Sequence, residues 1–153
     1  MLHNSNLLKS QVNGIILLNV SKEVFTVGDE SELYHRLMTD LENLKLPIDE
    51  VNIELRPFST TYYGRYFPST QKIYVYPYEN EDGEFMKYSD ILCTVIHEMV
   101  HHIQHQDPNF KRRKGIMHNP QFWQLYNHFV LRAIDLNILK REEVRNYGKE
   151  AKC

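Results

Sequence analysis

The sequence predicts one α+β domain in which a small, mostly antiparallel sheet packs on helices and one helix lies at the centre. Three observations predict this fold. Strand-like and helix-like segments occur in blocks rather than in regular alternation. The segment 89–106 carries a continuous apolar stripe at helical spacing, and five of the eight histidines fall between His97 and His118. The 153 residues suit a single domain, with strands and a helix expected in 1–50 and the core in 51–137.

Composition excludes several classes of protein. The hydrophobic share of 42% and the charged share of 25% are typical of a globular protein and not of a disordered one. A net charge of −2 argues against a generally basic nucleic-acid-binding protein. No apolar run approaches the ~18 residues of a membrane span, and the first residues do not resemble a signal peptide. Two cysteines, Cys93 and Cys153, are too few for a disulfide framework. We therefore expect a cytoplasmic protein with no membrane contact.

The first third of the chain predicts two strands and then a helix. Residues 12–20 and 24–27 are rich in strand-forming residues. A helix follows, because four leucines repeat on one face: Leu33, Leu37, Leu41 and Leu44. Asp29 or Ser31 could cap this helix, and Pro47 is expected to end it.

The middle of the chain predicts strands. Residues 51–58 alternate apolar and polar side chains, and 61–67 and 72–78 are rich in aromatic and β-branched residues. The sequence PSTQ between the last two segments is typical of a turn, so these segments should form a hairpin.

Two helices are expected after the strands. Ser89 or Asp90 could cap the helix over 89–106, and Pro108 prevents its continuation. Asn119 followed by Pro120 combines a cap with a proline at the first helical position. The apolar face of that second helix is made by Phe122, Trp123, Tyr126, Phe129, Val130, Ala133 and Ile134. Residues 140–147 could form a short last helix.

The helix over 89–106 contains His97-Glu98-Met99-Val100-His101, an HExxH motif. Residues four apart lie on one helix face, so both imidazoles can reach one Zn²⁺ at ~2.0–2.1 Å. Zinc lowers the pKa of a coordinated water towards ~7, and Glu98 could take the proton as that water attacks a carbonyl. The motif predicts a hydrolytic zinc centre.

A catalytic zinc needs a third protein ligand. In the longer motif HExxHxxGxxH, the third ligand is a histidine six residues after the second one. This motif would need Gly at position 104 and His at position 107, but the sequence has Gln104 and Asp107, so it is excluded. His118, just before the capped Pro120 helix, is the best candidate. Glu142 and Glu143 remain alternatives.

IHEMVHHIQH followed by GIMHNPQFW resembles the SprT-like and WLM-type metallopeptidases over residues 62–129. The resemblance implies a zincin-like fold, one Zn²⁺ held by His97, His101 and His118, and Glu98 as general base. It also implies a protein or peptide substrate. The chain departs from the pattern in two ways. Asn119 follows the third histidine where glycine is usual, and there is no C-terminal four-cysteine zinc ribbon.

Other residues near the motif have less specific interpretations. We expect His102 and His105 to be solvent-exposed and Cys93 to be a small core residue. Three tyrosines could stabilise an oxyanion, although packing is the more usual role in a sheet: Tyr62, Tyr63 and Tyr66.

A basic run separates the two parts of the motif. It comprises Lys111, Arg112, Arg113 and Lys114. The run could be a solvated loop, or it could contact DNA, because the resemblance implies DNA-linked proteolysis in some members of the group. Two other functions therefore stay open: a catalytically inactive zinc-binding regulator, and a DNA-associated protein with structural zinc.

Overall fold

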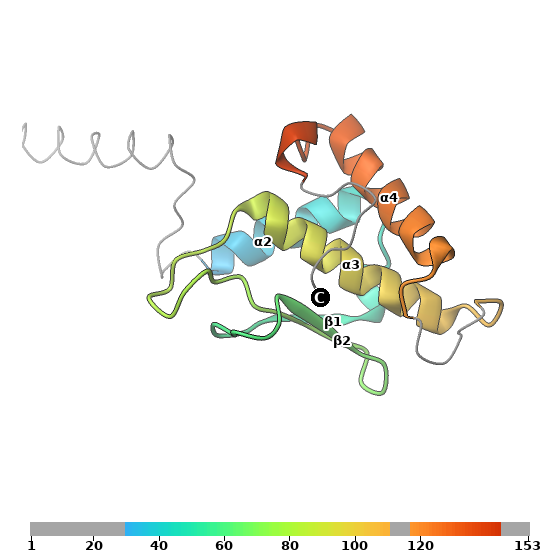
Figure 1. Cartoon of the computed structure of the whole chain (residues 1–153), viewed down its shortest axis with the longest axis horizontal. Coiled ribbons are helices and arrows are strands. Elements are labelled where there is room, and N and C mark those ends of the chain that lie inside the picture. Colours follow the sequence, from blue (N-terminus) through green and yellow to red (C-terminus); the bar gives the residue numbers. More distant parts are fainter. Residues whose placement is uncertain (1–29, 111–116, 145–153) are drawn as a thin grey trace, which may run out of the picture.

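The computed structural model describes residues 30–110 and 117–144 (Figure 1). In chain order the elements are α2 (Glu30–Asn43), the 3₁₀ turn η1 (Ile48–Glu50), β1 (Asn52–Leu55), β2 (Gly64–Phe67), β3 (Lys72–Val75), α3 (Tyr88–Gln106), α4 (Pro120–Asp135) and the 3₁₀ turn η2 (Arg141–Glu143). The α+β class is confirmed. The strands expected over 12–20 and 24–27, and the candidate cap Asp29, lie outside the described residues.

The sheet is mixed, so the expectation of a mostly antiparallel sheet is wrong. Its strand order is β1-β3-β2. The predicted hairpin is confirmed, since β2 and β3 pair antiparallel with Gly64 opposite Val75. However, β1 runs parallel to β3, with Ile53 opposite Ile73. The connection over 56–63 is too long for a tight turn and contains Pro57, which has no N–H for a ladder. The chain therefore reaches the far edge first, and β3 returns between the other two strands.

Helix α3 lies over the sheet and forms the centre of the core (Figure 1). It contacts β2 and β3 on one side and α4 on another. From the sheet, Ile73 and Val75 point into this core and are fully buried. From α4, Phe122 and Val130 are fully buried as well. The metal motif therefore sits on the most enclosed helix of the described chain.

Helix α2 packs its leucine face inward as predicted. The four leucines Leu33, Leu37, Leu41 and Leu44 are all fully buried. Two tyrosines join α2 to the start of α3 and to the segment before it, because Tyr88 donates to Asp40 and Tyr78 donates to Glu30. The guanidinium of Arg36 lies 3.7 Å from the centre of the Tyr88 ring.

The helix ends differ in part from the sequence predictions. Helix α2 ends at Asn43, four residues before Pro47, because Lys45 adopts a left-handed conformation with φ 60°. Ser31 lies inside α2 and does not cap it. Helix α3 begins at Tyr88 after Lys87, so neither Ser89 nor Asp90 is its cap.

The start of α4 is as predicted. The side chain of Asn119 accepts a hydrogen bond from the Phe122 N–H at 2.9 Å, and Pro120 is the first helical residue. Of the short helix expected over 140–147, the structure shows only the turn η2, and 145–147 lie outside the described residues. None of the described helices is long and apolar enough to cross a membrane.

Candidate metal centre

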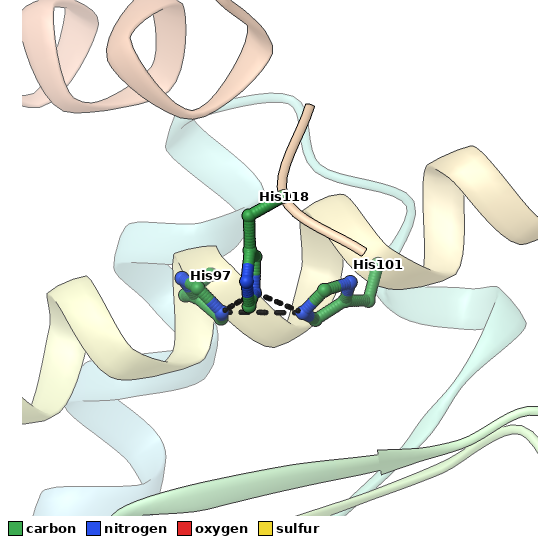
Figure 2. Close-up of side chains that lie close together, drawn as sticks. All are labelled: His97, His101 and His118. Carbon is green, nitrogen blue, oxygen red and sulfur yellow. Dashed lines mark hydrogen bonds between the residues drawn. The ribbon is translucent and has the colours of Figure 1, made fainter. Parts of the chain in front are cut away.

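Three histidine side chains converge beside α3 (Figure 2). His97 and His101 project from adjacent turns of α3, and His118 comes from the segment that leads into α4. Their Nε2 atoms lie 3.2 Å apart for His97 and His101, 3.0 Å for His97 and His118, and 3.1 Å for His101 and His118. The Asn119 cap and Pro120 fix the chain directly after His118, so the third ring is held by the start of a helix.

The spacing of these nitrogens fits a metal ion. Three ligands at ~2.0–2.1 Å in a tetrahedral shell lie roughly 3.3–3.4 Å from one another. The observed separations of 3.0–3.2 Å are close to this value, and all three nitrogens point at a common centre. Three imidazoles without a carboxylate or thiolate form a ligand set suited to Zn²⁺. Among the described residues, this is the one group of three such side chains able to hold a metal.

The environment of His97 favours the ligand form of imidazole. The side chain is fully buried, and its ring packs against the rings of Phe122, Trp123 and Tyr126. Burial, followed by the neighbouring His101 and His118, lowers the pKa of His97 to about 2. His97 is thus neutral at physiological pH, and a neutral imidazole is the form that binds metals.

Glu98 lies on a different face of α3 from the histidines. It is buried, with 4% of its surface exposed. Burial raises the pKa of its carboxyl to about 7, and a hydrogen bond from the backbone N–H of Tyr66 opposes that rise. Strand β2 approaches so closely that a Cβ on Gly64 would lie 3.0 Å from Cγ of Glu98. Only glycine at position 64 gives the carboxylate this room.

The backbone register places Glu98 at the open edge of the sheet. In an antiparallel pair, alternate residues direct their N–H and C=O towards the partner strand. The N–H of Tyr76 donates to the carbonyl of Tyr63 at 2.9 Å, so the odd-numbered residues of β2 face β3. Gly64 and Tyr66 therefore direct their backbone groups to the other side. Since β2 has one strand neighbour among the described residues, that side is an edge, and Glu98 receives the Tyr66 N–H there.

Histidines 102 and 105 have different outcomes. The prediction that His102 is exposed is wrong, because its side chain is fully buried and bonded to Glu50 and Tyr66. His105 is exposed, as predicted, with its ring edge-on to that of Tyr66.

Cys93 is half-buried and packs against the core, so the prediction of a buried core residue is confirmed in part. Burial raises the pKa of its thiol to about 11, against a hydrogen bond from Tyr126.

The remaining predicted residues have separate outcomes. Tyr62 and Tyr63 are exposed, at 37% and 45%. Glu142 and Glu143 lie in η2 and do not belong to the metal-binding group that the described residues form. The basic run 111–114 is outside the described residues.

Sequence reasoning missed Glu50. This residue ends η1, and its carboxylate oxygen lies 2.8 Å from Nε2 of His102. Nothing in the local sequence around Glu50 indicates this contact, because its partner is 52 residues further along the chain.

Comparisons with known proteins leave the chain without a named relative. Its sequence matches no protein-family model and no curated protein, and no solved structure matches its fold.

Proposed function

We propose that this protein is a zinc-dependent metallopeptidase with a zincin-like active site, similar to the SprT-like and WLM-type enzymes that its motifs resemble. His97, His101 and His118 would hold one Zn²⁺, and Glu98 would be the general base. The observation that carries the proposal is the convergence of three Nε2 atoms within 3.2 Å of one another, next in sequence to a buried carboxylate. The cytoplasmic location and the DNA contact of residues 111–114 remain predictions.

The donor set determines the chemistry the site can supply. When bound there, zinc would lower the pKa of a coordinated water and polarise the carbonyl of a substrate. Three protein ligands leave a fourth position open, which is typical of catalytic rather than structural zinc.

Strand β2 gives an extended peptide a place to bind. Peptides add to exposed sheet edges through main-chain hydrogen bonds. The N–H and C=O of Gly64 face the open edge of the described sheet, two residues from the Tyr66 N–H that binds Glu98. A substrate paired with Gly64 would thus pass beside the Glu98 carboxylate.

Glu98 is suited to carry a proton between two steps. Its carboxylate takes a proton from the attacking water while the water oxygen bonds to the scissile carbonyl carbon. The carboxylic acid so formed gives the proton to the amide nitrogen as the C–N bond breaks. Burial raises the pKa of this carboxyl in the metal-free chain, which favours its action as a base.

Metal content and turnover test the proposal separately. Purified protein should contain about one zinc per chain, and His118→Ala should lose most of its zinc affinity. His128→Ala is the matched control, because His128 lies on α4 and is not part of the histidine cluster. A His118→Ala protein with undiminished affinity would exclude His118 as a ligand.

Glu98→Gln tests the catalytic role. It should keep the zinc and lose about 10²–10⁴-fold in hydrolysis of labelled casein, the usual contribution of a general base. Wild-type turnover by Glu98→Gln would refute the role of Glu98. A wild-type protein with one zinc per chain that cleaves neither casein nor a random peptide library would favour the inactive zinc-binding regulator.

A further inference from the structure

His102 has a buried position that the proposed zinc centre does not explain. It follows the metal-binding His101 but lies about 100° further around the helix. Its side chain is fully buried, and both of its ring nitrogens have partners. Nε2 lies 2.8 Å from the Glu50 carboxylate, and Nδ1 lies 3.0 Å from the Tyr66 hydroxyl. One ring thus joins η1, α3 and β2.

The chemistry of the carboxylate fixes the direction of the hydrogen bond between His102 and Glu50. A carboxylate only accepts, so Nε2 of His102 must carry the hydrogen that reaches Glu50. Nδ1 of His102 shares the other hydrogen bond with the Tyr66 hydroxyl, a group that can both donate and accept. The three side chains form one chain in the order Tyr66 to His102 to Glu50.

The position of His102 on the helix links this chain to Glu98. Glu98 and His102 are four residues apart, so they lie one turn from each other on the same face of α3. Both reach the same residue of β2, since the backbone N–H of Tyr66 donates to Glu98 and its hydroxyl contacts His102. Tyr66 is therefore held to α3 at two points, by its backbone and by the end of its side chain.

We propose that Glu50, His102 and Tyr66 are positioning residues that hold β2 at a fixed height over α3 and thereby orient the Glu98 carboxylate. This inference rests on the proposed function for the role of Glu98. The contacts of the chain stand independently of that role. Because β2 is an edge strand in the described sheet, β3 holds it from one side only. The tether from Tyr66 to His102 supplies the second attachment, to the helix that carries Glu98.

Tyr66→Phe removes the tether and keeps the ring. Tyr74→Phe is the matched control, because Tyr74 lies directly across the β2–β3 ladder from Arg65, and its ring contacts Arg56 and the ring of Phe67. The main readout is amide hydrogen exchange of Tyr66 in the zinc-loaded protein, taken relative to the Val75 amide to remove global effects. Loss of one hydrogen bond should accelerate the relative exchange about two- to tenfold in Tyr66→Phe. Tyr74→Phe should leave it unchanged.

Kinetics and metal binding give the second readout. If peptide hydrolysis is found, Tyr66→Phe should lower kcat by roughly ten- to a hundredfold with little change in KM and in zinc affinity, since the ligands are untouched. Equal losses in Tyr66→Phe and Tyr74→Phe, or a change in KM alone, would overturn the positioning role.

Substitutions at Glu50 keep the test decisive if Tyr66→Phe folds poorly. Glu50→Gln retains an acceptor for His102, so Tyr66 exchange should be closer to wild type than in Glu50→Ala. Unchanged exchange in both Tyr66→Phe and Glu50→Ala would refute the inference. Faster exchange in a protein that shows no peptidase activity would leave the tether standing and refute the proposed function alone.

Discussion

Gly64 is the position where β2 and α3 meet most closely, and its substitution by alanine should loosen the site. An added Cβ would lie 2.7 Å from Cγ2 of Thr94 and 3.0 Å from Cγ of Glu98. Ordinary carbon contacts are ~3.5–4.0 Å, so β2 and α3 would have to separate by roughly 0.5–1 Å. Among the described residues, the glycine with a positive φ is Gly83. An alanine at position 64 therefore causes no backbone strain. Overpacking of this kind costs about 1–3 kcal/mol.

A double-mutant cycle isolates the clash. Thr94→Ser removes the Cγ2 methyl that the new Cβ would strike, and serine keeps a hydroxyl that can donate to the Asp90 carbonyl as Thr94 does. Urea unfolding of the four proteins should show Gly64→Ala destabilised by about 1–3 kcal/mol. Adding Thr94→Ser should restore roughly 1 kcal/mol of that loss.

Two results would refute this reasoning. One is a Gly64→Ala protein as stable as the wild type, which would mean that β2 does not press on α3. The other is a cycle with no coupling between positions 64 and 94, which would place the cost elsewhere. Zinc affinity should change little in all four proteins, because neither Gly64 nor Thr94 belongs to the histidine group.

Three further outcomes follow from the structure. If zinc binds as proposed, a chelator should lower the melting temperature by roughly 5–10 °C, because an ion at about 100 times its Kd contributes about 2.7 kcal/mol to the free energy of unfolding. Scanning calorimetry measures the melting temperature, and an unchanged value would contradict zinc binding. Burial and the bond to Glu30 raise the pKa of Tyr78 from 10.0 to about 12. The native state therefore holds the proton more tightly, so this contribution to stability is complete below pH 10 and is lost as the pH rises to 12. Unfolding free energies of Tyr78→Phe should accordingly fall less steeply across that window than those of the wild type. The pKa of Cys93 is raised from 9.0 to about 11, so its thiolate is about a hundredfold less populated at pH 8 than that of an unperturbed cysteine. In a Cys153→Ser background, alkylation of Cys93 should therefore be far slower in native than in unfolded protein.

The features that sequence predicted are those set by local geometry. Spacing of four residues placed His97 and His101 on one face of a helix, and the Asn119–Pro120 pair predicted a helix start that holds His118. These two local signals made His118 the best candidate for a third ligand, and the resemblance implied the full set of three, whose rings the structure brings together. The leucine face of α2 and the β2–β3 hairpin likewise depend on contacts between near neighbours in the chain.

The features that sequence did not predict depend on distant partners. β1 pairs with β3 and not with β2, which follows it in the chain. The sequence around β1 and β3 contains no turn or spacing that indicates this pairing. The exposure predicted for His102 followed from its place about 100° around the helix from His101. Its burial depends on Glu50 and Tyr66, which lie 52 and 36 residues away. A polar side chain can be buried when its hydrogen bonds are satisfied, and here both ring nitrogens are.

In the sequence His-Glu-Met-Val-His-His, the last histidine, His102, adds a second pair of residues that are four apart. Residues 97 and 101 form one pair with a spacing of four, and residues 98 and 102 form a second pair that is shifted by one position. The two pairs therefore occupy two neighbouring faces of α3. The pair His97 and His101 meets His118 on one face. The pair Glu98 and His102 meets Tyr66 of β2 on the other. A rotation of about 100° around the helix axis thus separates the side that can bind a metal from the side that holds the sheet edge. Under the proposed mechanism, Glu98 acts where the two faces adjoin, which explains why its position would depend on the strand as much as on the helix.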